Sequence, residues 1–387
     1  MAGSRSGQPP GPGEGPAKTP TAPPSIRPRS EPAIAPIPPN AKISGRQSSS
    51  WRLAMVDFSL VAASRRIVEG ALSVVPGETV TVIADRERLD LARALLDAVM
   101  ERNARGLLVV LEEIGTRPLP KLPDLVVSQL QRSQASVYLA GFDAGERQMR
   151  AELVSQVPKL GIRHAHMVGI TRKSLCTGFS ADPQRIADAA RSVRTRLRAD
   201  SVLRAFGALG TELTVRCHPT HKWVEHSGVI RPGKWENLPT GEILTAPGDV
   251  KGVFNCNASM SESFGERFGF LRDMPVRFMI ESGYVRNVFC PDSRLEREIR
   301  AWLMSGDHLD RVGLVVIGTN VGMRDPVGEI LCDQNLPGLH IGLGSTFPEL
   351  TGAAWNTPRQ LMLASAYTDV DLDGAPLIRS GRFLDLK

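Results

Sequence analysis

The run Asn-Leu-Pro-Thr-Gly-Glu-Ile-Leu-Thr-Ala-Pro, residues 237–247, is the most informative stretch of this chain. A second run, Pro-Gly-Leu-His-Ile-Gly-Leu-Gly, follows at residues 337–344. Each run holds one side chain that can ligate a metal, Glu242 in the first and His340 in the second. Taken alone, Glu242 is equally well explained as a strand-end carboxylate in an ion pair, and His340 as a buried, hydrogen-bonded core histidine. The two runs therefore gain meaning from their order, their spacing and the residues around them.

The first run closely resembles a signature of the thermophilic-type metalloaminopeptidases, the aminopeptidase T and aminopeptidase S class. The second run resembles another block of that family, and in the family the Glu and the His of these blocks are metal ligands. Residues 210–214 resemble the segment that ends the family's first domain, and Asp373-Gly374 resembles its closing turn. The resemblance covers roughly residues 75–387. It implies an N-terminal doubly wound α/β domain followed by a C-terminal β-rich domain of the aminopeptidase T type.

The other ligands that the resemblance implies are replaced. A two-metal peptidase site needs several carboxylates and imidazoles to hold two cations and activate a bridging water. The family's second Glu aligns with Leu314, its terminal His-x-Asp pair aligns with Gln360-Leu361-Met362, and no His follows His340. We therefore expect no bound metal, no cofactor and no catalytic residue, but a drier pocket that binds a ligand. The candidate ligand-binding residues are Glu242, Leu314, Asn320, His340, Gln360 and Met362.

Hydrophobic patterns predict strands alternating with helices before residue 210. Residues 79–84 and 107–111 are continuous apolar runs, typical of a parallel sheet covered on both faces. A helix is expected between them, over about 86–103, with Asp85 as its N-cap. The other expected elements are a strand at 137–140 and helices at 144–157, from Asp182-Pro183 onward, and at 292–304. Short apolar runs separated by Gly and Pro after 210 indicate a β-rich part. We predict domains at 51–235 (α/β) and 236–387 (β-rich).

Composition and charge limit the possible partners. Residues 1–50 hold 12 of the 29 prolines and a net charge of +4, and we expect them to be a disordered tail. The remaining 337 residues carry only +2 of the total charge of +6, which argues against a nucleic-acid surface. No apolar run has the length of a signal peptide or a membrane span. Five cysteines, an odd number without a C-x-x-C pair, favour reduced thiols in a cytoplasmic protein.

Two further clusters have plainer explanations. Residues 217–226 contain one Cys and three His, but their spacing matches no common zinc pattern, so we do not expect a zinc site. Five arginines on the helix after Asp182 suggest an anionic partner, but their spacing places them off the apolar stripe of Ile186, Ala190, Val193 and Leu197. A solvated helix face is the favoured interpretation of these arginines.

Three functions follow, and the leading hypothesis is a metal-free peptide-binding protein. Such a homologue is similar to proteins that present a ribosomal precursor peptide to modifying enzymes in natural-product pathways, as in crocagin-type biosynthesis, and the family resemblance implies a homodimer. The alternative is a metal-dependent enzyme of the same fold, an aminopeptidase or a non-haem iron ring-cleaving dioxygenase resembling 2,5-dihydroxypyridine dioxygenase. The third is a scaffold whose Pro-rich tail, residues 1–50, binds a partner.

Overall fold

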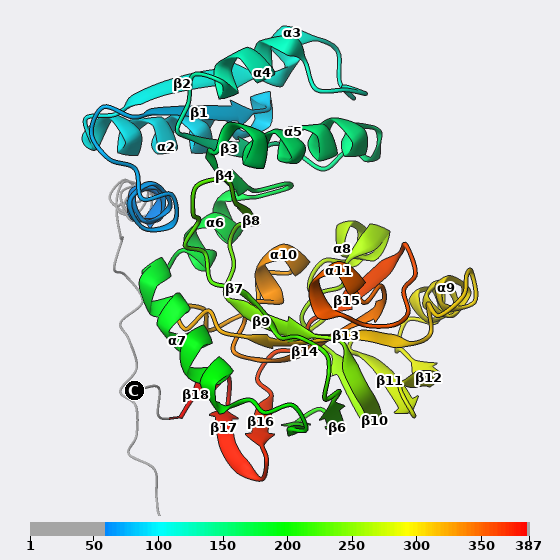
Figure 1. Ribbon diagram of the computed structural model, residues 1–387. Helices are drawn as coiled ribbons and strands as arrows, with labels where there is room; N and C mark the ends of the chain where they lie inside the picture. Colours follow the sequence, from blue (N-terminus) through cyan, green and yellow to red (C-terminus); the bar gives the residue numbers. More distant parts are fainter. Residues whose placement is uncertain (1–58, 385–387) are drawn as a thin grey trace, which may run out of the picture. The chain divides into compact units, whose positions relative to one another are not determined.

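The computed structural model describes residues 59–384, which lie within one unit of the chain, Ser49–Lys387 (Figure 1). The predicted disordered tail at 1–50 lies outside the described residues. The strands of the described part form three sheets: a parallel sheet of five strands, an antiparallel sheet of eight and an antiparallel sheet of five. The predicted class, α/β followed by β-rich, is confirmed.

The parallel sheet has the strand order β2-β1-β3-β4-β8. Its strands are β1 (Thr79–Ala84), β2 (Arg105–Val110), β3 (Ala135–Leu139), β4 (Arg163–His166) and β8 (Trp235–Asn237). All neighbouring pairs run parallel. The strand order reverses between β1 and β3, so the sheet is doubly wound and its connections pass over both faces.

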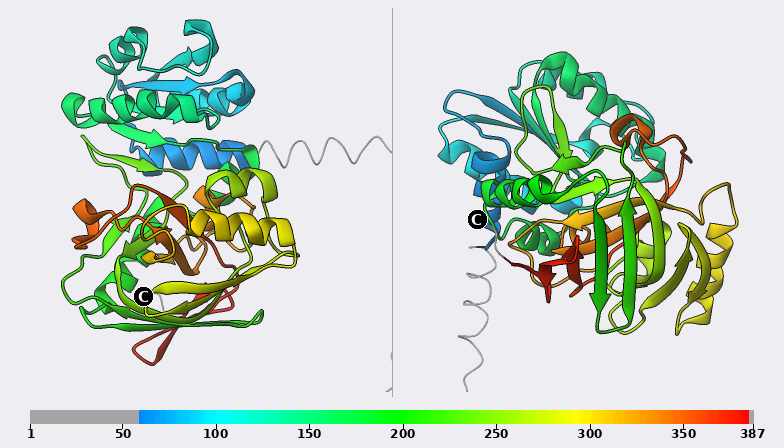
Figure 2. Two further views of the ribbon diagram at one scale, coloured as in Figure 1. Left: turned by 90° about the vertical axis from the view of Figure 1, so that its right-hand side faces the viewer. Right: turned by 60° about the horizontal axis from the view of Figure 1, so that its bottom comes forward.

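Helices cover both faces of this sheet because its strands are apolar on both sides. Val80 and Val82 pack against η1 (Arg66–Ala71) and α2 (Leu89–Glu101). Ile83 and Tyr138 pack on the other face, against α4 (Asp124–Leu130) and α5 (Arg147–Leu160) (Figures 1 and 2). Asp85 caps the helical segment as predicted, since its side chain accepts a hydrogen bond from the Arg88 backbone nitrogen at 3.0 Å. The remaining elements are η2 (Arg86–Arg88), α3 (Leu111–Ile114), η3 (Ala144–Glu146), α6 (Arg172–Gly178) and α7 (Pro183–Arg196).

Two antiparallel sheets make up the β-rich part, and the right-hand view of Figure 2 shows the long strands of the larger one. The eight-stranded sheet has the order β12-β11-β10-β6-β5-β16-β17-β18. Its strands are β5 (Val202–Gly207), β6 (Thr211–Cys217), β10 (Pro247–Cys256), β11 (Val276–Glu281), β12 (Tyr284–Phe289), β16 (Asp369–Leu372), β17 (Ala375–Arg379) and β18 (Arg382–Phe383). The five-stranded sheet, in the order β15-β14-β13-β9-β7, contains β7 (Val224–His226), β9 (Glu242–Thr245), β13 (Val312–Gly318), β14 (Gly338–Gly344) and β15 (Gln360–Leu363).

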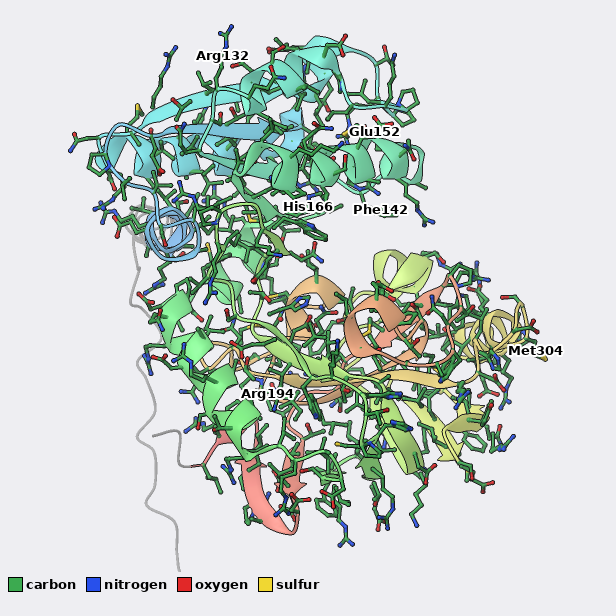
Figure 3. The ribbon with its side chains drawn as sticks, in the orientation of Figure 1. Arg132, Phe142, Glu152, His166, Arg194 and Met304 are labelled. Carbon is green, nitrogen blue, oxygen red and sulfur yellow. The ribbon has the colours of Figure 1, made fainter. Side chains whose placement is uncertain are left out.

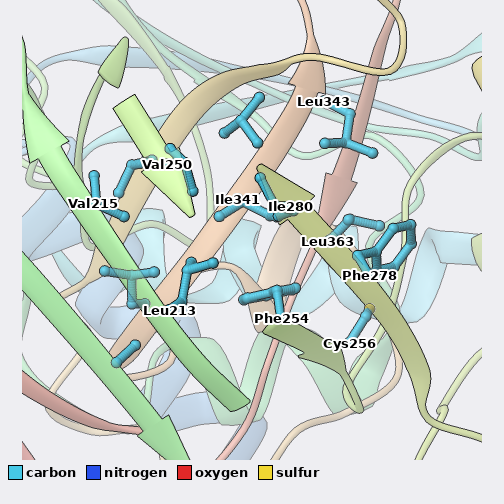
Figure 4. Close-up of a cluster of buried hydrophobic side chains, with 14 of the residues drawn as sticks. Leu213, Val215, Val250, Phe254, Cys256, Phe278, Ile280, Ile341, Leu343 and Leu363 are labelled. Carbon is cyan, nitrogen blue, oxygen red and sulfur yellow. The ribbon is translucent and has the colours of Figure 1, made fainter. Parts of the chain in front are cut away.

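The main core lies between these two sheets (Figure 4). Buried and exposed residues alternate along β11, so the eight-stranded sheet turns one face to the core and the other to solvent. Every residue of β13 and β14 is buried, because both faces of these strands are covered. The helix predicted at 292–304 is α9 (Ser293–Leu303), and its Leu295 and Ile299 enter this core. Three shorter helices are α8 (Glu262–Phe268), α10 (Ile330–Asp333) and α11 (Pro348–Thr351).

The chain crosses between the parallel sheet and the antiparallel sheets more than once. The predicted domain boundary at 235/236 therefore does not separate the strands of one sheet from those of the others. Strands β5 and β6, residues 202–217, pair with β16 and β10 in the eight-stranded sheet. Strand β8, after them in the chain, returns to the parallel sheet beside β4. Strand β6 joins the eight-stranded sheet because its buried and exposed residues alternate, which suits a sheet with one face in solvent.

Two further findings concern the cysteines and the helices of the described part. All five cysteines lie in this part and are free thiols, as their odd number predicts. No helix within 59–384 combines the length and the apolar character that crossing a membrane requires.

Candidate functional site

Residues 237–247 form the passage of the chain from the parallel sheet to the five-stranded sheet. Asn237 ends β8 and Glu242 begins β9. Between them, Gly241 has a φ of +128°, and a Cβ there would come 2.6 Å from Ile186 on α7 and 2.9 Å from Asn320. Glycine suits this position because a side chain would strain the backbone and collide with both neighbours. The passage thereby places Glu242 on the five-stranded sheet.

Asn320 holds this passage in place. Its Nδ2 donates to the carbonyl oxygens of Gly178, at 2.8 Å, and Thr240, at 3.0 Å. Its Oδ1 accepts a hydrogen bond from the Gly322 backbone nitrogen at 3.2 Å. The residue is fully buried and lies beyond the end of β13. Both amide hydrogens are therefore used within the protein, and the structure does not bring Asn320 onto the sheet face that carries the other candidate residues.

The other five candidates share one face of the five-stranded sheet. In the strand register, Glu242 lies opposite Gly318, His340 opposite Val316, and both Leu314 and Met362 opposite Gly342. Residues two apart on a strand point to the same side, so Gln360 and Gly318 also belong to this face. We call it the ligand face.

Gly342 marks the centre of the ligand face. A Cβ on Gly342 would lie 2.7 Å from the Met362 Sδ, 3.2 Å from the Gln360 Nε2 and 3.3 Å from the Leu314 Cβ. These three residues are the ones at which the sequence resemblance places metal ligands. The positions that the resemblance assigns to a metal therefore converge in space, and here their side chains are an amide, a thioether and an alkyl group.

The ligand face is packed with apolar groups. Leu244, Leu314, Val316 and Met362 form one buried cluster. Three residues from other segments pack against it: Val224, Ile330 and Phe347. Gln360 is engaged as well, since its Nε2 donates to the Ser345 carbonyl oxygen at 3.3 Å. The floor of this face is accordingly lined by apolar side chains.

His340 is a hydrogen-bonded core histidine. Its Nε2 lies 2.9 Å from the Leu336 carbonyl oxygen, and its Nδ1 accepts a hydrogen bond from the Ser365 backbone nitrogen at 3.1 Å. These contacts require the tautomer with the proton on Nε2, which leaves no lone pair for a metal. Burial lowers the pKa of His340 to about 4, so the ring is neutral at physiological pH.

Glu242 is buried and incompletely paired. Its Oε2 has no hydrogen-bond partner, and its Oε1 lies 3.8 Å from the His226 Nδ1 on the neighbouring strand β7. Burial first, and then the charge of Glu236, raise the pKa of Glu242 to about 8, while the nearby Gln334 offsets only part of this rise. Glu242 is therefore protonated at neutral pH.

These side chains do not fit a metal ion of the kind that the fold family implies. A divalent cation needs ionised carboxylates and free imidazole nitrogens. The ligand face offers one carboxyl group, Glu242, a His340 with both nitrogens engaged, and the apolar Leu314 and Met362. Among the side chains that the structure describes within 59–384, which leave out Glu262 and Glu266, no group of three or more His, Cys, Asp or Glu is placed to hold a metal.

The second metal candidate, residues 217–226, is spread over separate places. Cys217 is buried at the end of β6, where burial raises the pKa of its thiol to about 12. His218 and His221 stack on each other with ring centroids 3.9 Å apart. His226 lies on β7 and faces Glu242. Residues 217–226 therefore divide between a strand of the eight-stranded sheet, a loop and the edge strand of the five-stranded sheet.

A cavity of about 510 Å³ lies next to the ligand face. Apolar side chains supply much of its wall: Phe142, Val168, Ile170, Met260, Ile330 and Leu331. Phe142, which Figure 3 labels, follows the C-terminal end of β3. The volume of the cavity lies within the roughly 300–1,000 Å³ of typical ligand pockets. Such a cavity suits a ligand with apolar groups.

Two residues connect the cavity to the ligand face. Ile330 lines the cavity and also packs against the Leu314 and Met362 cluster. Ser261 lines the cavity, and its Oγ accepts a hydrogen bond from the Met362 backbone nitrogen at 2.9 Å. None of the six candidate residues lines the cavity itself. One feature of the sequence did indicate the cavity: Pro239, from the run 237–247, is part of its wall.

The strand-order reversal of the parallel sheet, a common ligand site, is filled by the protein's own charges. Asp85 follows β1 and accepts hydrogen bonds from Gly141 N (2.6 Å), Arg88 (2.6 Å) and Arg117 (3.1 Å). Glu146 is fully buried and pairs with Arg117 through two contacts of 2.7 Å. This network satisfies itself, so the cavity is the better candidate for a binding site.

Comparison with solved structures shows what the fold is similar to. The structure of 2,5-dihydroxypyridine dioxygenase from Pseudomonas putida KT2440 matches with a TM-score of 0.58 and 14% identity, over 85% of this chain and 97% of that one. Wild-type AmpT from Thermus thermophilus matches with a TM-score of 0.56 and 18% identity, over 85% of this chain and 99% of that one. No family model and no curated protein matches the chain. At these identities the likeness shows a related fold and leaves the chemistry open.

Proposed function

We propose that this chain is a non-catalytic peptide-binding protein built on a fold of the metalloaminopeptidase type. The observation that carries the proposal is the convergence around Gly342 of Leu314, Gln360 and Met362, beside a cavity of about 510 Å³. Peptidase chemistry in this fold family depends on cations at the ligand face. At that face His340 is engaged by the protein and Leu314, Gln360 and Met362 stand where ligands are expected, whereas the neighbouring cavity has the volume and the apolar wall of a binding site.

Three features favour a peptide as the ligand. The resemblance at residues 237–247 and 337–344 is to a family whose cleft recognises peptide ends. The cavity wall combines apolar side chains with the hydroxyl groups of Ser261 and Ser263. The wall also includes Gly265 and Gly328, which have no side chain and so let an extended backbone approach closely. Within the same proposal, the peptide is a ribosomal precursor that the protein presents to modifying enzymes in the cytoplasm.

Metal content and binding are the first experiment. The protein is purified without chelators, its metals are measured by mass spectrometry, and peptide binding is followed by calorimetry with and without EDTA. The proposal expects less than stoichiometric metal and the same affinity in both buffers. Stoichiometric zinc, manganese, cobalt or iron, with binding or turnover that EDTA abolishes, would overturn it. Iron with oxygen uptake on an aromatic diol would favour the ring-cleaving alternative.

A pair of phenylalanine variants tests where the peptide binds. Phe142 lines the cavity with 56% of its surface exposed, and Phe289, at the end of β12, is 46% exposed and is not part of the cavity wall. Phe142→Ala should weaken peptide binding by about tenfold, as the loss of one aromatic contact predicts. Phe289→Ala should leave binding unchanged. Equal effects of the two variants would contradict binding in this cavity.

The family resemblance also motivates a homodimer as part of the proposal. Sedimentation equilibrium over a range of concentrations tests it, and a single species with the mass of one chain would refute it.

A further inference from the structure

The charges in the cavity wall are few and unequal in their partners. Among the described residues that line the cavity, only Arg147 and Glu329 are charged. Glu329 accepts a hydrogen bond from the Thr171 hydroxyl at 2.8 Å. Arg147 is the first residue of α5 and is exposed, and its guanidinium makes no hydrogen bond or ion pair with the side chains and backbone that the structure describes. The cavity thus combines an apolar wall with one solvent-exposed guanidinium group that no described protein group pairs with.

We infer that the cavity binds the C-terminal end of a peptide, with an apolar last residue in the pocket and the terminal carboxylate on Arg147. This inference rests on the proposed function and names the part of the peptide that is recognised. A guanidinium presents parallel N–H donors that match the two oxygens of a carboxylate. The apolar wall holds the last side chain, and its volume suits a few residues of an extended chain rather than a folded partner.

The second charge sets the direction of the peptide. Glu329 comes from the segment before α10, whereas Arg147 comes from the parallel-sheet part of the fold. A carboxylate beside Glu329 would be repelled, and one beside Arg147 would be attracted. The terminal carboxylate is therefore expected at Arg147, with the preceding residues leading toward Glu329. A phosphate group, with nearly two negative charges, would be only partly neutralised by a single arginine.

The test compares the acid and amide forms of the same peptides. A pooled set of pentapeptides ending in two residues drawn from Leu, Ile, Val and Phe is prepared as free acids, as C-terminal amides and as N-acetylated acids. Binding to the full chain is measured by equilibrium dialysis. The free acids and N-acetylated acids should bind alike, and the amides about tenfold more weakly. Amides that bind as well as acids would refute the inference and leave the proposed function standing. Failure of all three forms to bind would contradict the proposed function itself.

Variants of Arg147 separate recognition from a general effect of charge. Arg147→Gln should reduce acid binding to the level of the amide and leave amide binding unchanged, while Arg147→Lys should restore part of the preference. Arg132→Gln is the matched control, because Arg132 is exposed and lies before β3, at the strand end away from Phe142 (Figure 3). Thermal unfolding checks that all three variants are folded. Equal losses from Arg147→Gln and Arg132→Gln would overturn the assignment.

Discussion

Glu242 and His226 face each other across strands β9 and β7, with the Oε1 and Nδ1 atoms 3.8 Å apart, and they do not form a charged pair at neutral pH. Burial raises the pKa of Glu242 to about 8 and lowers the pKa of His226 below its usual value. Both groups are thus neutral, because the sheet face excludes the water that would stabilise their charges. Glu242 is thus a buried neutral acid at neutral pH, and this state has measurable consequences.

Replacing Glu242 should change how stability depends on pH. The folded state holds the Glu242 proton more tightly than the unfolded chain does, so wild-type stability is lost as the pH rises from the usual value of 4.5 toward about 8. Glu242→Gln keeps the size and removes this titration. We expect the variant to match the wild type at pH 5 and to exceed its free energy of unfolding by more than about 1 kcal/mol at pH 9. Urea unfolding at both pH values measures the difference.

The control for this prediction is Glu212→Gln, which alters an exposed glutamate on strand β6. Its stability difference from the wild type should be the same at pH 5 and pH 9. A Glu242→Gln variant that parallels the wild type over the whole pH range would show that Glu242 is ionised in the folded protein.

Truncating the floor of the ligand face should destabilise the fold. Met362 is 7% exposed and packs with Leu314 and Val316, so Met362→Ala leaves a void that rigid β-strands cannot fill. We expect a loss of about 2–4 kcal/mol in the free energy of unfolding. Met304→Ala, at a position that is 81% exposed, should cost less than about 0.5 kcal/mol. Denaturant unfolding of both variants measures these losses. Similar losses in the free energy of unfolding for the two variants would contradict the packing of Met362.

Removing the Asn320 side chain should loosen the passage between the sheets. Asn320→Ala leaves the carbonyl oxygens of Gly178 and Thr240 without their donor, and we expect a loss of about 2–4 kcal/mol. Asn237→Ala changes an exposed asparagine in the same run and should be nearly neutral. Peptide binding is measured in parallel: a large loss of binding with unchanged stability would assign Asn320 to the ligand instead.

Restoring the aligned ligands should restore a response to zinc. The triple variant Leu314→Glu, Gln360→His, Met362→Asp places metal-binding groups around Gly342, next to Glu242. Without metal it should unfold more easily than the wild type, because charges enter an apolar floor. Zinc at a hundredfold excess over its dissociation constant should then stabilise it by about 3 kcal/mol. Thermal unfolding with zinc and with EDTA measures this.

Two controls accompany the triple variant. The wild type should show no zinc-dependent shift, and adding Glu242→Gln to the triple variant should weaken the shift. A folded triple variant without any zinc response would show that these positions do not converge closely enough to share a metal.

Local sequence pattern was sufficient for the elements of the parallel sheet. The apolar run at 79–84 is β1, Asp85 caps the helical segment that follows, and Asp182-Pro183 opens α7. These elements are predictable because their hydrogen bonds and caps lie within a few residues of each other in the chain. The domain boundary was not predictable in this way, since β6 and β8 choose their sheets through partners far away in the sequence.

The sequence alone determined which chemical groups stand at the aligned ligand positions: an alkyl side chain at 314, an amide at 360 and a thioether at 362. Only the tertiary structure decided that these groups meet at Gly342, that Asn320 braces a loop, and that both nitrogens of His340 are engaged. It also assembled the cavity from segments as distant as Phe142 and Ile330. The physical reason is that a side chain's identity is local, whereas its burial, its hydrogen-bond partners and its pKa are set by residues that only folding brings near.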